Sequence, residues 1–174
     1  MKSAPLKNAR WLVVLSIPCI AHAQALVTER SLAVTAANEA AMAALEQCRK
    51  EGHRVAVTVL DHAGRTKVAL RDDGANPHTV QHSLNKAYTA LTYRMASGEY
   101  GKRAAASFPG SSGALHLDKI TTAAGGLPIR AGKDLVGAIG VSGSPSGAGG
   151  QGGGATDEKC AQAGLDRIAK GLGN

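Results

Sequence analysis

The order in which helical and strand-like patterns follow one another along this chain is the feature that most constrains its fold. An amphipathic pattern predicts a helix from Thr28 to Glu51. Runs rich in β-branched residues then predict two strands, Arg54 to Leu60 and Arg65 to Arg71, joined by a short turn into a hairpin. A second helical pattern runs from Thr79, its expected N-cap, to about Ala96, and Gly98 is expected to end it.

The second half of the chain is less regular. A short helix is expected through Ala104 to Ala106, within an irregular stretch. Strands are expected over Ile120 to Ala124, Leu127 to Arg130 and Leu135 to Ser142, and Thr156 should cap a last helix running to about Gly171. The order α-β-β-α-(α)-β-β-β-α lacks the alternation of a doubly wound sheet. It predicts a single α+β domain with a central antiparallel sheet flanked by helices.

Aromatic residues make up only 3% of the chain, so the core must be built mainly from Ala, Val, Leu and Ile. Such small side chains permit close packing of helices on a sheet. The residues expected on the buried helix faces are Val34, Ala37, Ala41, Leu45 and Cys48, then Val80, Leu84, Ala87, Leu91 and Met95, and finally Ala161, Leu165, Ile168 and Leu172.

The first 23 residues have the three parts of a cleavable secretory signal. Lys2, Lys7 and Arg10 form a positive leader, Trp11 to Ile20 is apolar, and Ala21-His-Ala23 offers small residues for cleavage. The alternative, an uncleaved anchor, needs about 20 apolar residues, and this run is only about half as long. We therefore expect a periplasmic or secreted protein whose domain spans residues 26–172.

Outside the expected signal, the charged residues are typical of an ordinary protein surface. The chain has 20 Lys and Arg against 13 Asp and Glu, and three of the basic residues belong to the leader. About 150 residues would remain after cleavage, enough for one domain. The basic residues are scattered and not interleaved with aromatic ones, which argues against a nucleic-acid surface. No membrane insertion is expected after cleavage.

Signal cleavage would remove Cys19 and leave two cysteines. Cys48 ends the first expected helix on its buried face, and Cys160 opens the last helix. In an oxidising compartment, such a pair predicts a Cys48–Cys160 disulfide, provided that the two terminal helices pack side by side. The alternative is two buried free thiols.

Two short motifs match known functional patterns but lack the neighbouring elements or partner motifs that those patterns require. The segment 143–155 is nearly all Gly, Ser and Ala, and its Gly147 to Gly152 formally matches a dinucleotide fingerprint. No βαβ unit can follow it, so the segment is interpreted as a linker before the last helix. Ser83 and Lys86 match the Ser-x-x-Lys element of acyl enzymes, but its partner motifs are missing, so Lys86 is interpreted as an ordinary helical lysine.

Apart from His22 in the leader, the histidines are His53, His62, His78, His82 and His116. Of these, His78 and His82 are four residues apart at the start of the second expected helix, so their imidazoles can face one side. They could bind a metal or lie near a haem iron. The spacing alone favours the alternative, that both are solvated surface histidines.

Several short motifs, taken together, resemble the GlcG/HbpS-like haem-binding family, which includes the C-terminal domain of PduO-type proteins. The resemblance covers about Leu26 to Gly171. It is carried by Val59-Leu-Asp-His-Ala-Gly64, Asp73-Gly-Ala75, Lys86-Ala-Tyr-Thr-Ala90, Gly125-Gly-Leu-Pro-Ile129, Gly137-Ala-Ile-Gly-Val-Ser-Gly143 and Asp157-Glu158. The chain departs from the family by inserting Gly147 to Ala155 before the last of these motifs.

The resemblance implies an α+β fold, homo-oligomers that are often octameric, and haem as cofactor. It fixes no axial ligand, so His78, His82 and His116 are all candidates, with Lys119 beside the last as a partner for a haem propionate. The leading hypothesis is an exported haem-binding protein in haem or iron handling or redox sensing. The alternatives are an enzyme that degrades haem with oxygen or assists small-metabolite catabolism, and an oligomeric partner of a membrane sensor.

Overall fold

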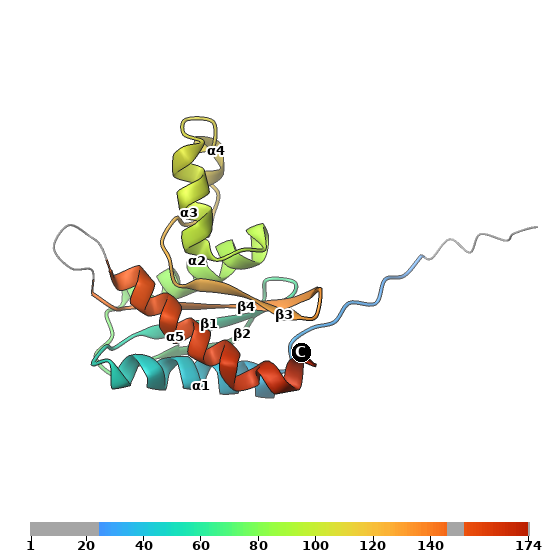
Figure 1. The fold of residues 1–174 in the computed structure, drawn as a ribbon, viewed down its shortest axis with the longest axis vertical. Coiled ribbons are helices and arrows are strands. Elements are labelled where there is room, and N and C mark those ends of the chain that lie inside the picture. Colours follow the sequence, from blue (N-terminus) through green and yellow to red (C-terminus); the bar gives the residue numbers. More distant parts are fainter. Residues whose placement is uncertain (1–24, 146–151, 174) are drawn as a thin grey trace, which may run out of the picture.

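A four-stranded sheet lies at the centre of the molecule (Figure 1). The structure is a computed structural model that describes residues 25–145 and 152–173. The expected secretory signal, residues 1–23, lies outside the described residues, as do 146–151 of the expected glycine-rich linker.

The sheet is antiparallel throughout, as the hairpin pattern predicts. Its strands are β1 (Ala56–Asp61), β2 (Thr66–Arg71), β3 (Gly126–Ala131) and β4 (Asp134–Ser142), in the order β2-β1-β4-β3. Two hairpins thus meet where β1 pairs with β4, and these two strands are buried along nearly their whole length. The predicted α+β class is confirmed.

One expected strand is absent. Residues 120–123 have no sheet partner, because side chains from neighbouring helices satisfy their backbone instead. The N–H of Thr121 donates to Oγ1 of Thr89, and Oγ of Ser97 donates to the carbonyl of Ala123. An apolar run with β-branched residues is therefore compatible with an extended connection as well as with a strand.

Helices cover both faces of the sheet. On one face lie α1 (Val34–Lys50) and α5 (Gly153–Ile168), which pack against each other, and α5 continues into a short 3₁₀ helix, Ala169–Leu172. On the other face lies α2 (His78–Tyr93). Two apolar clusters result, a larger one under α1 and α5 and a smaller one under α2.

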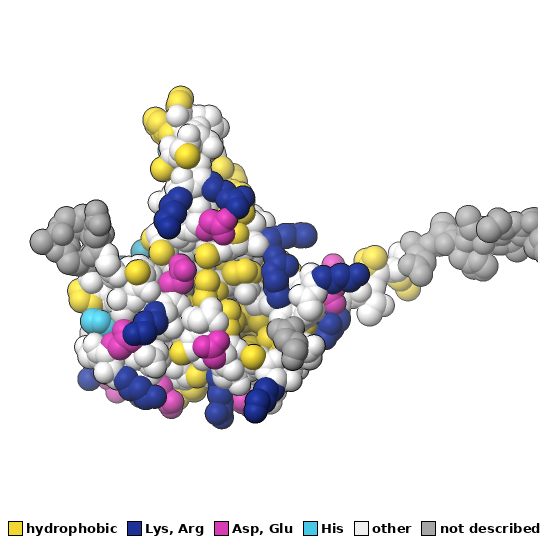
Figure 2. All heavy atoms as spheres, viewed as in Figure 1, with side chains coloured by type: hydrophobic (Ala, Val, Ile, Leu, Met, Phe, Trp, Pro, Cys, Tyr) yellow, Lys and Arg dark blue, Asp and Glu magenta, His cyan; other side chains and the backbone are white. Residues whose placement is uncertain are grey.

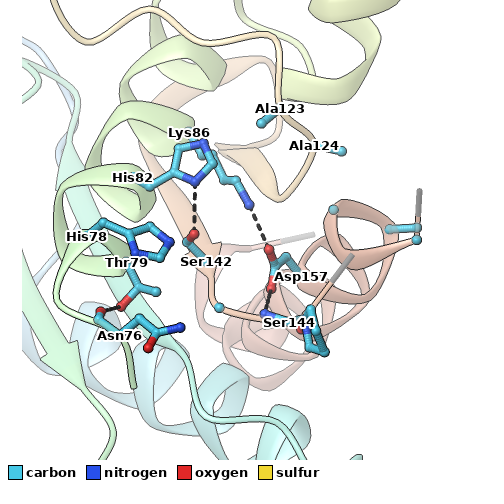
Figure 3. Close-up of a pocket in the computed structure, with 15 residues that line it drawn as sticks. Asn76, His78, Thr79, His82, Lys86, Ala123, Ala124, Ser142, Ser144 and Asp157 are labelled. Carbon is cyan, nitrogen blue, oxygen red and sulfur yellow. Dashed lines mark hydrogen bonds and ion pairs between the residues drawn. The ribbon is translucent and has the colours of Figure 1, made fainter. Parts of the chain in front are cut away.

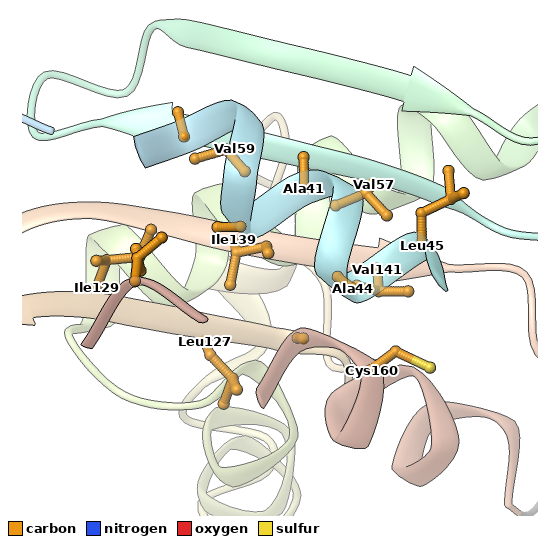
Figure 4. Packing of buried hydrophobic residues seen from close by; sticks show 14 of the residues in the cluster. Ala41, Ala44, Leu45, Val57, Val59, Leu127, Ile129, Ile139, Val141 and Cys160 are labelled. Carbon is orange, nitrogen blue, oxygen red and sulfur yellow. The ribbon is translucent and has the colours of Figure 1, made fainter. Parts of the chain in front are cut away.

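Small residues let the helices approach closely, as the composition predicts. Ala37, Ala40, Ala41 and Ala44 of α1 are completely buried in the core cluster. Figure 4 shows Ala41 and Ala44 facing the sheet. A Cβ atom on Gly164 of α5 would lie 2.6 Å from the carbonyl oxygen of Ala40, so no larger residue fits there. This contact between α1 and α5 also brings their cysteines together. Cys48 and Cys160 form a disulfide in the structure, with Cα atoms 5.5 Å apart.

Two helix starts were placed wrongly from the sequence. The first helix begins at Val34 rather than Thr28, because the segment before it is extended and the N–H of Leu32 donates to the carbonyl of Val136. The last helix begins at Gly153, so Thr156 lies inside its first turn and is not its cap.

The expected end of the second helix is also wrong. That helix, α2, stops at Tyr93, and Arg94 follows in a left-handed conformation with φ 58° and ψ 28°. Gly98, expected to end the helix, lies instead within the next one, α3 (Ser97–Ala106).

An arm projects from the α2 side of the sheet (Figure 1). It consists of α3 and the short α4 (Ser112–Leu115), where the sequence predicted only a short helix and a loop. Stacked rings of Tyr93 and Tyr100, with centroids 3.9 Å apart, fix its base. Phe108, near its tip, is 68% exposed. Within residues 25–145 and 152–173, no helix has both the length and the apolar character that a membrane span requires.

Candidate functional site

A cavity of about 520 Å³ opens where the start of α2, the end of β4 and the start of α5 converge (Figure 3). Its walls combine small residues with a group of polar side chains. The lining residues are Asn76, His78, Thr79, His82, Lys86, Ala123, Ala124, Ser142, Gly143, Ser144, Pro145, Gly152, Gly154, Ala155 and Asp157.

The helix α2 contributes a buried polar face to this region, which its apolar periodicity did not predict. Thr79, Ser83 and Lys86 are buried, whereas Val80, expected in the core, is 39% exposed. Oγ of Ser83 lies 2.7 Å from Oγ1 of Thr58 on β1, so this polar face is hydrogen-bonded to the sheet. The helix is therefore rotated so that polar side chains, rather than Val80, meet the end of β4.

Lys86 and Asp157 form an ion pair at the inner wall of the cavity. Nζ of Lys86 donates to Oδ2 of Asp157 at 2.7 Å and to the carbonyl of Val141 at 3.0 Å, and both charged side chains are only 3% exposed. Burial lowers the pKa of Lys86, and the neighbouring carboxylate of Asp157 opposes that shift. The other carboxylate oxygen, Oδ1, accepts the N–H of Ser144 at 3.0 Å. One carboxylate thus joins α2, β4 and α5.

Glycine is required beside this ion pair. A Cβ atom on Gly125 would lie 3.0 Å from Nζ of Lys86 and 2.8 Å from Cβ of Asp157, and its φ of +123° disfavours other residues. A Cβ atom on Gly126 would lie 2.1 Å from the carbonyl oxygen of Lys86. The Gly-Gly pair at the start of β3 therefore allows that strand to pass directly under α2.

His82 faces the cavity in a fixed orientation. Its Nδ1 lies 3.1 Å from Oγ of Ser142, the last residue of β4 (Figure 3). Burial, and then the positive charge of Lys86, lower the pKa of His82. Its ring is therefore neutral near pH 7. Within the described residues its other nitrogen, Nε2, makes no hydrogen bond, and a neutral imidazole with one unengaged nitrogen can ligate a metal.

The structure brings together two of the four residues singled out from the sequence. His78 and His82 both line the cavity, one helical turn apart, with His78 exposed. His116 and Lys119 do not line it. His116 is exposed at the end of α4 in the arm, and the ammonium of Lys119 lies 5.3 Å from the ring centroid of Tyr88. No group of three or more His, Cys, Asp or Glu in the described ranges is placed to hold a metal ion.

Sequence reasoning missed Lys86, Asp157, Ser142 and Ser144. Lys86 was interpreted as an ordinary helical lysine, and Asp157 was noted as part of a family motif. The available signal was the spacing of Lys86, which places it one turn after His82 on the same face of the helix. Its partner lies 71 residues further along the chain, so only the fold reveals the pair.

The fold and site define an α+β protein with a polar cavity where its central strand β4 ends. A family model described as haem degrading protein HbpS-like matches residues 32–166. The chain therefore belongs to the HbpS-like family, and the resemblance drawn from its motifs is confirmed.

Relatives of known structure support this assignment. Crystal structures of HbpS, one of them of a double mutant of the Streptomyces reticuli protein, match with a TM-score of 0.73 and 34% identity. The first of these matches covers 82% of this chain and 93% of that one. A haem complex of the PduO C-terminal domain matches with a TM-score of 0.68 and 24% identity over 79% of this chain and 95% of that one, which shows the shared fold.

A curated relative from Citrobacter freundii is an uncharacterised 15.0 kDa protein in the dhaT-dhaS intergenic region. It is 32% identical over 117 residues, which cover 65% of this chain and 80% of the relative.

Proposed function

We propose that this protein binds haem in the cavity between α2, β4 and α5, with His82 as the axial ligand. The observation that carries the proposal is the orientation of the His82 imidazole, which lines the cavity with its Nδ1 3.1 Å from Oγ of Ser142. If its Nδ1–H donates to Oγ of Ser142, the lone pair of Nε2 is available to an iron in the cavity. Ligating histidines commonly donate their other ring N–H to a neighbouring group in this way, which fixes both tautomer and orientation.

The cavity fits such a ligand in size and in its donor groups. Its volume of about 520 Å³ lies within the range of small-molecule and cofactor sites. Ala123, Ala124 and Ala155 present methyl groups, and His78 offers a second imidazole at the exposed rim. Bound haem would supply an iron that accepts an imidazole ligand and exchanges electrons. The part of the protein is to orient His82 and to hold the walls through the pair of Lys86 and Asp157.

Titration of the purified protein with haemin tests the proposal. We expect a Soret band of ligated haem in the wild type and in His116→Ala, a matched control on the exposed arm, and its loss or shift in His82→Ala. Because the pKa of His82 is lowered, protons should displace the ligand only below about pH 6.5, the ordinary value for histidine. An unchanged spectrum in His82→Ala would contradict the assignment of the ligand, and no spectral change in the wild type would contradict haem binding itself.

Export is a second part of the proposal. It is supported by the leader, apolar run and small residues within the first 23 positions. In a bacterial host we expect the mature protein in the periplasm or the medium, beginning after Ala23. Intact-mass measurement of fractionated cells tests this expectation, and an uncleaved chain in the cytoplasm would refute it.

Haem degradation is the alternative activity that the family description favours. The haem complex should then bleach and release iron when oxygen and a reductant are supplied. A complex that keeps its Soret band under these conditions would leave only the binding role.

The arm supports a further proposal, that the protein forms homo-oligomers. Phe108 and Leu117 are 68% and 59% exposed, and large exposed side chains on a projecting element are typical of contact surfaces. Light scattering should report an oligomer for the wild type and smaller species for Phe108→Ser/Leu117→Ser. A monomeric wild type would refute this proposal. Recovery of a sensor protein from an envelope fraction on the immobilised oligomer would support a signalling role.

A further inference from the structure

A second cavity lies at the opposite end of α2 and β4. Its volume is about 470 Å³, and its walls come from the N-terminal segment, the β1–β2 turn, the residue after α2 and the β3–β4 turn. The lining residues are Thr28, Glu29, Arg30, His62, Arg94, Lys133, Asp134 and Leu135. The strand β4 begins at this second cavity and ends at the first, which is the candidate haem site. The two cavities are therefore about 25 Å apart along the strand.

An ion pair and a hydrogen bond hold the N-terminal segment over this cavity. Nη1 of Arg30 lies 3.2 Å from Oδ2 of Asp134, and Nε2 of His62 lies 2.7 Å from Oε2 of Glu29. Both carboxylates of the cavity are therefore engaged by residues of its own wall. Nδ1 of His62 is buried and has no hydrogen-bond partner within residues 25–145 and 152–173.

The remaining charges are positive. Arg94 and Lys133 line the cavity, and neither has a carboxylate partner in the described part of the chain. Behind them, Nη2 of Arg130 donates to the carbonyl of Arg94 at 2.9 Å, and Arg130 also lacks a carboxylate partner there. Figure 2 shows Lys and Arg side chains gathered at this end of the molecule, where the N-terminal segment leaves it. The cavity thus has an excess of cationic groups.

The position of Arg94 is not explained by capping of α2. A left-handed residue after a helix is usually glycine, and a larger side chain there carries a conformational cost. A positive charge at this helix end is favoured by the dipole. However, the guanidinium of Arg130 already donates to the terminal carbonyl, so the side chain of Arg94 is available for another role.

We propose that this cavity binds a small anion that carries a carboxylate or phosphate group. The guanidinium of Arg94 offers two parallel N–H donors to two oxygens of such a group, and Lys133 adds a point charge. The hydroxyl of Thr28 supplies a further donor at the rim. The proposal is independent of haem binding, because it uses neither His78 nor His82.

Calorimetric titration with inorganic phosphate and with succinate, at constant ionic strength, tests the proposal. We expect saturable binding of at least one of the two anions to the wild type. Arg94→Ala/Lys133→Ala should weaken that binding about tenfold or more, since hydrogen bonds to charged groups are lost. Arg94→Lys keeps the charge without the paired donors, and should bind with intermediate affinity.

The matched control is Lys50→Ala/Lys102→Ala, which removes one exposed positive charge from the C-terminal end of α1 and one from α3 in the arm, neither of which lines this cavity. It should bind like the wild type. An equal loss in this control would reduce the effect to overall charge and overturn the proposal. Absence of saturable binding of both anions to the wild type would also overturn it. The haemin titration of Arg94→Ala/Lys133→Ala should be unchanged, so the two proposals fail separately.

Discussion

Replacing Asp157 with asparagine tests the central ion pair of the candidate site. Asparagine keeps an oxygen that can accept the N–H of Ser144, and it changes the volume little. It removes the negative charge 2.7 Å from Nζ of Lys86, whose side chain is 3% exposed. Lys86 must then either stay charged without a counter-ion or lose its proton in the folded state.

Both routes give a similar cost. Leaving one partner of a buried pair charged and unpaired costs about 3–5 kcal/mol. Removing a proton from a lysine with an ordinary pKa of about 10.4 costs about 4–5 kcal/mol at pH 7. We therefore expect Asp157→Asn to lose about 3–5 kcal/mol of unfolding free energy at pH 7, a large part of the stability of a typical domain.

The loss should shrink as the pH rises. Without its carboxylate partner, Lys86 would have a lower pKa in the folded variant than in the unfolded chain. Between these two values the unfolded state binds more protons, so the stability of the variant rises with pH relative to the wild type, by up to about 1.4 kcal/mol per pH unit. This gain ends near pH 10, where the unfolded chain also loses its proton.

Equilibrium urea unfolding of the oxidised protein at several pH values measures both effects. The double variant Lys86→Met/Asp157→Leu removes both charges and should recover to within about 1 kcal/mol of the wild type, since apolar replacement of buried pairs is often neutral. A stability of Asp157→Asn within about 0.5 kcal/mol of the wild type at pH 7 would refute the reasoning, because exposed pairs contribute that little.

Two further predictions concern the scaffold. Thiol titration of unfolded, non-reduced mature protein should find no free thiol, and two thiols per chain would contradict the pairing. Cys48→Ala/Cys160→Ala should lose about 4–5 kcal/mol of unfolding free energy, because the bridge closes a loop with a sequence separation of 112. Gly140→Ala should lose about 1–3 kcal/mol in urea unfolding, since its Cβ would lie 2.1 Å from the carbonyl oxygen of Ser83. Gly113→Ala in α4 has nothing within 4 Å of the added atom and should not destabilise; similar losses in both variants would refute the packing argument.

The sequence predicts local features of this fold well and long-range ones poorly. The hairpin of β1 and β2 follows from β-branched runs on either side of a turn, and both signals are contained in a few residues. The start of α1 was placed too early because the helical pattern continues before Val34. What ends it there is a hydrogen bond from Leu32 to Val136, about 100 residues away in the chain.

The same distinction applies to the candidate site. Spacing of four residues on one helix was enough to place His78 and His82 on one wall. The polar face of α2 was missed because Ser83 and Lys86 are buried only through partners on β1 and α5. Val80 and Leu84 fit an apolar periodicity, so the pattern of this segment pointed to their face as the buried one. The segment alone does not show that the face with Ser83 and Lys86 is the one that meets the sheet.

The contact between Ser144 and Asp157 has a consequence for how this protein can change. It ties the end of β4 to the second turn of α5, and Cys160, three residues further along that helix, anchors it to α1. With both flanks secured, each doubling in length of the connection between them would cost only about 0.6 kcal/mol. An engineered reporter inserted between Pro145 and Gly152, both of which line the cavity, should therefore cost little stability.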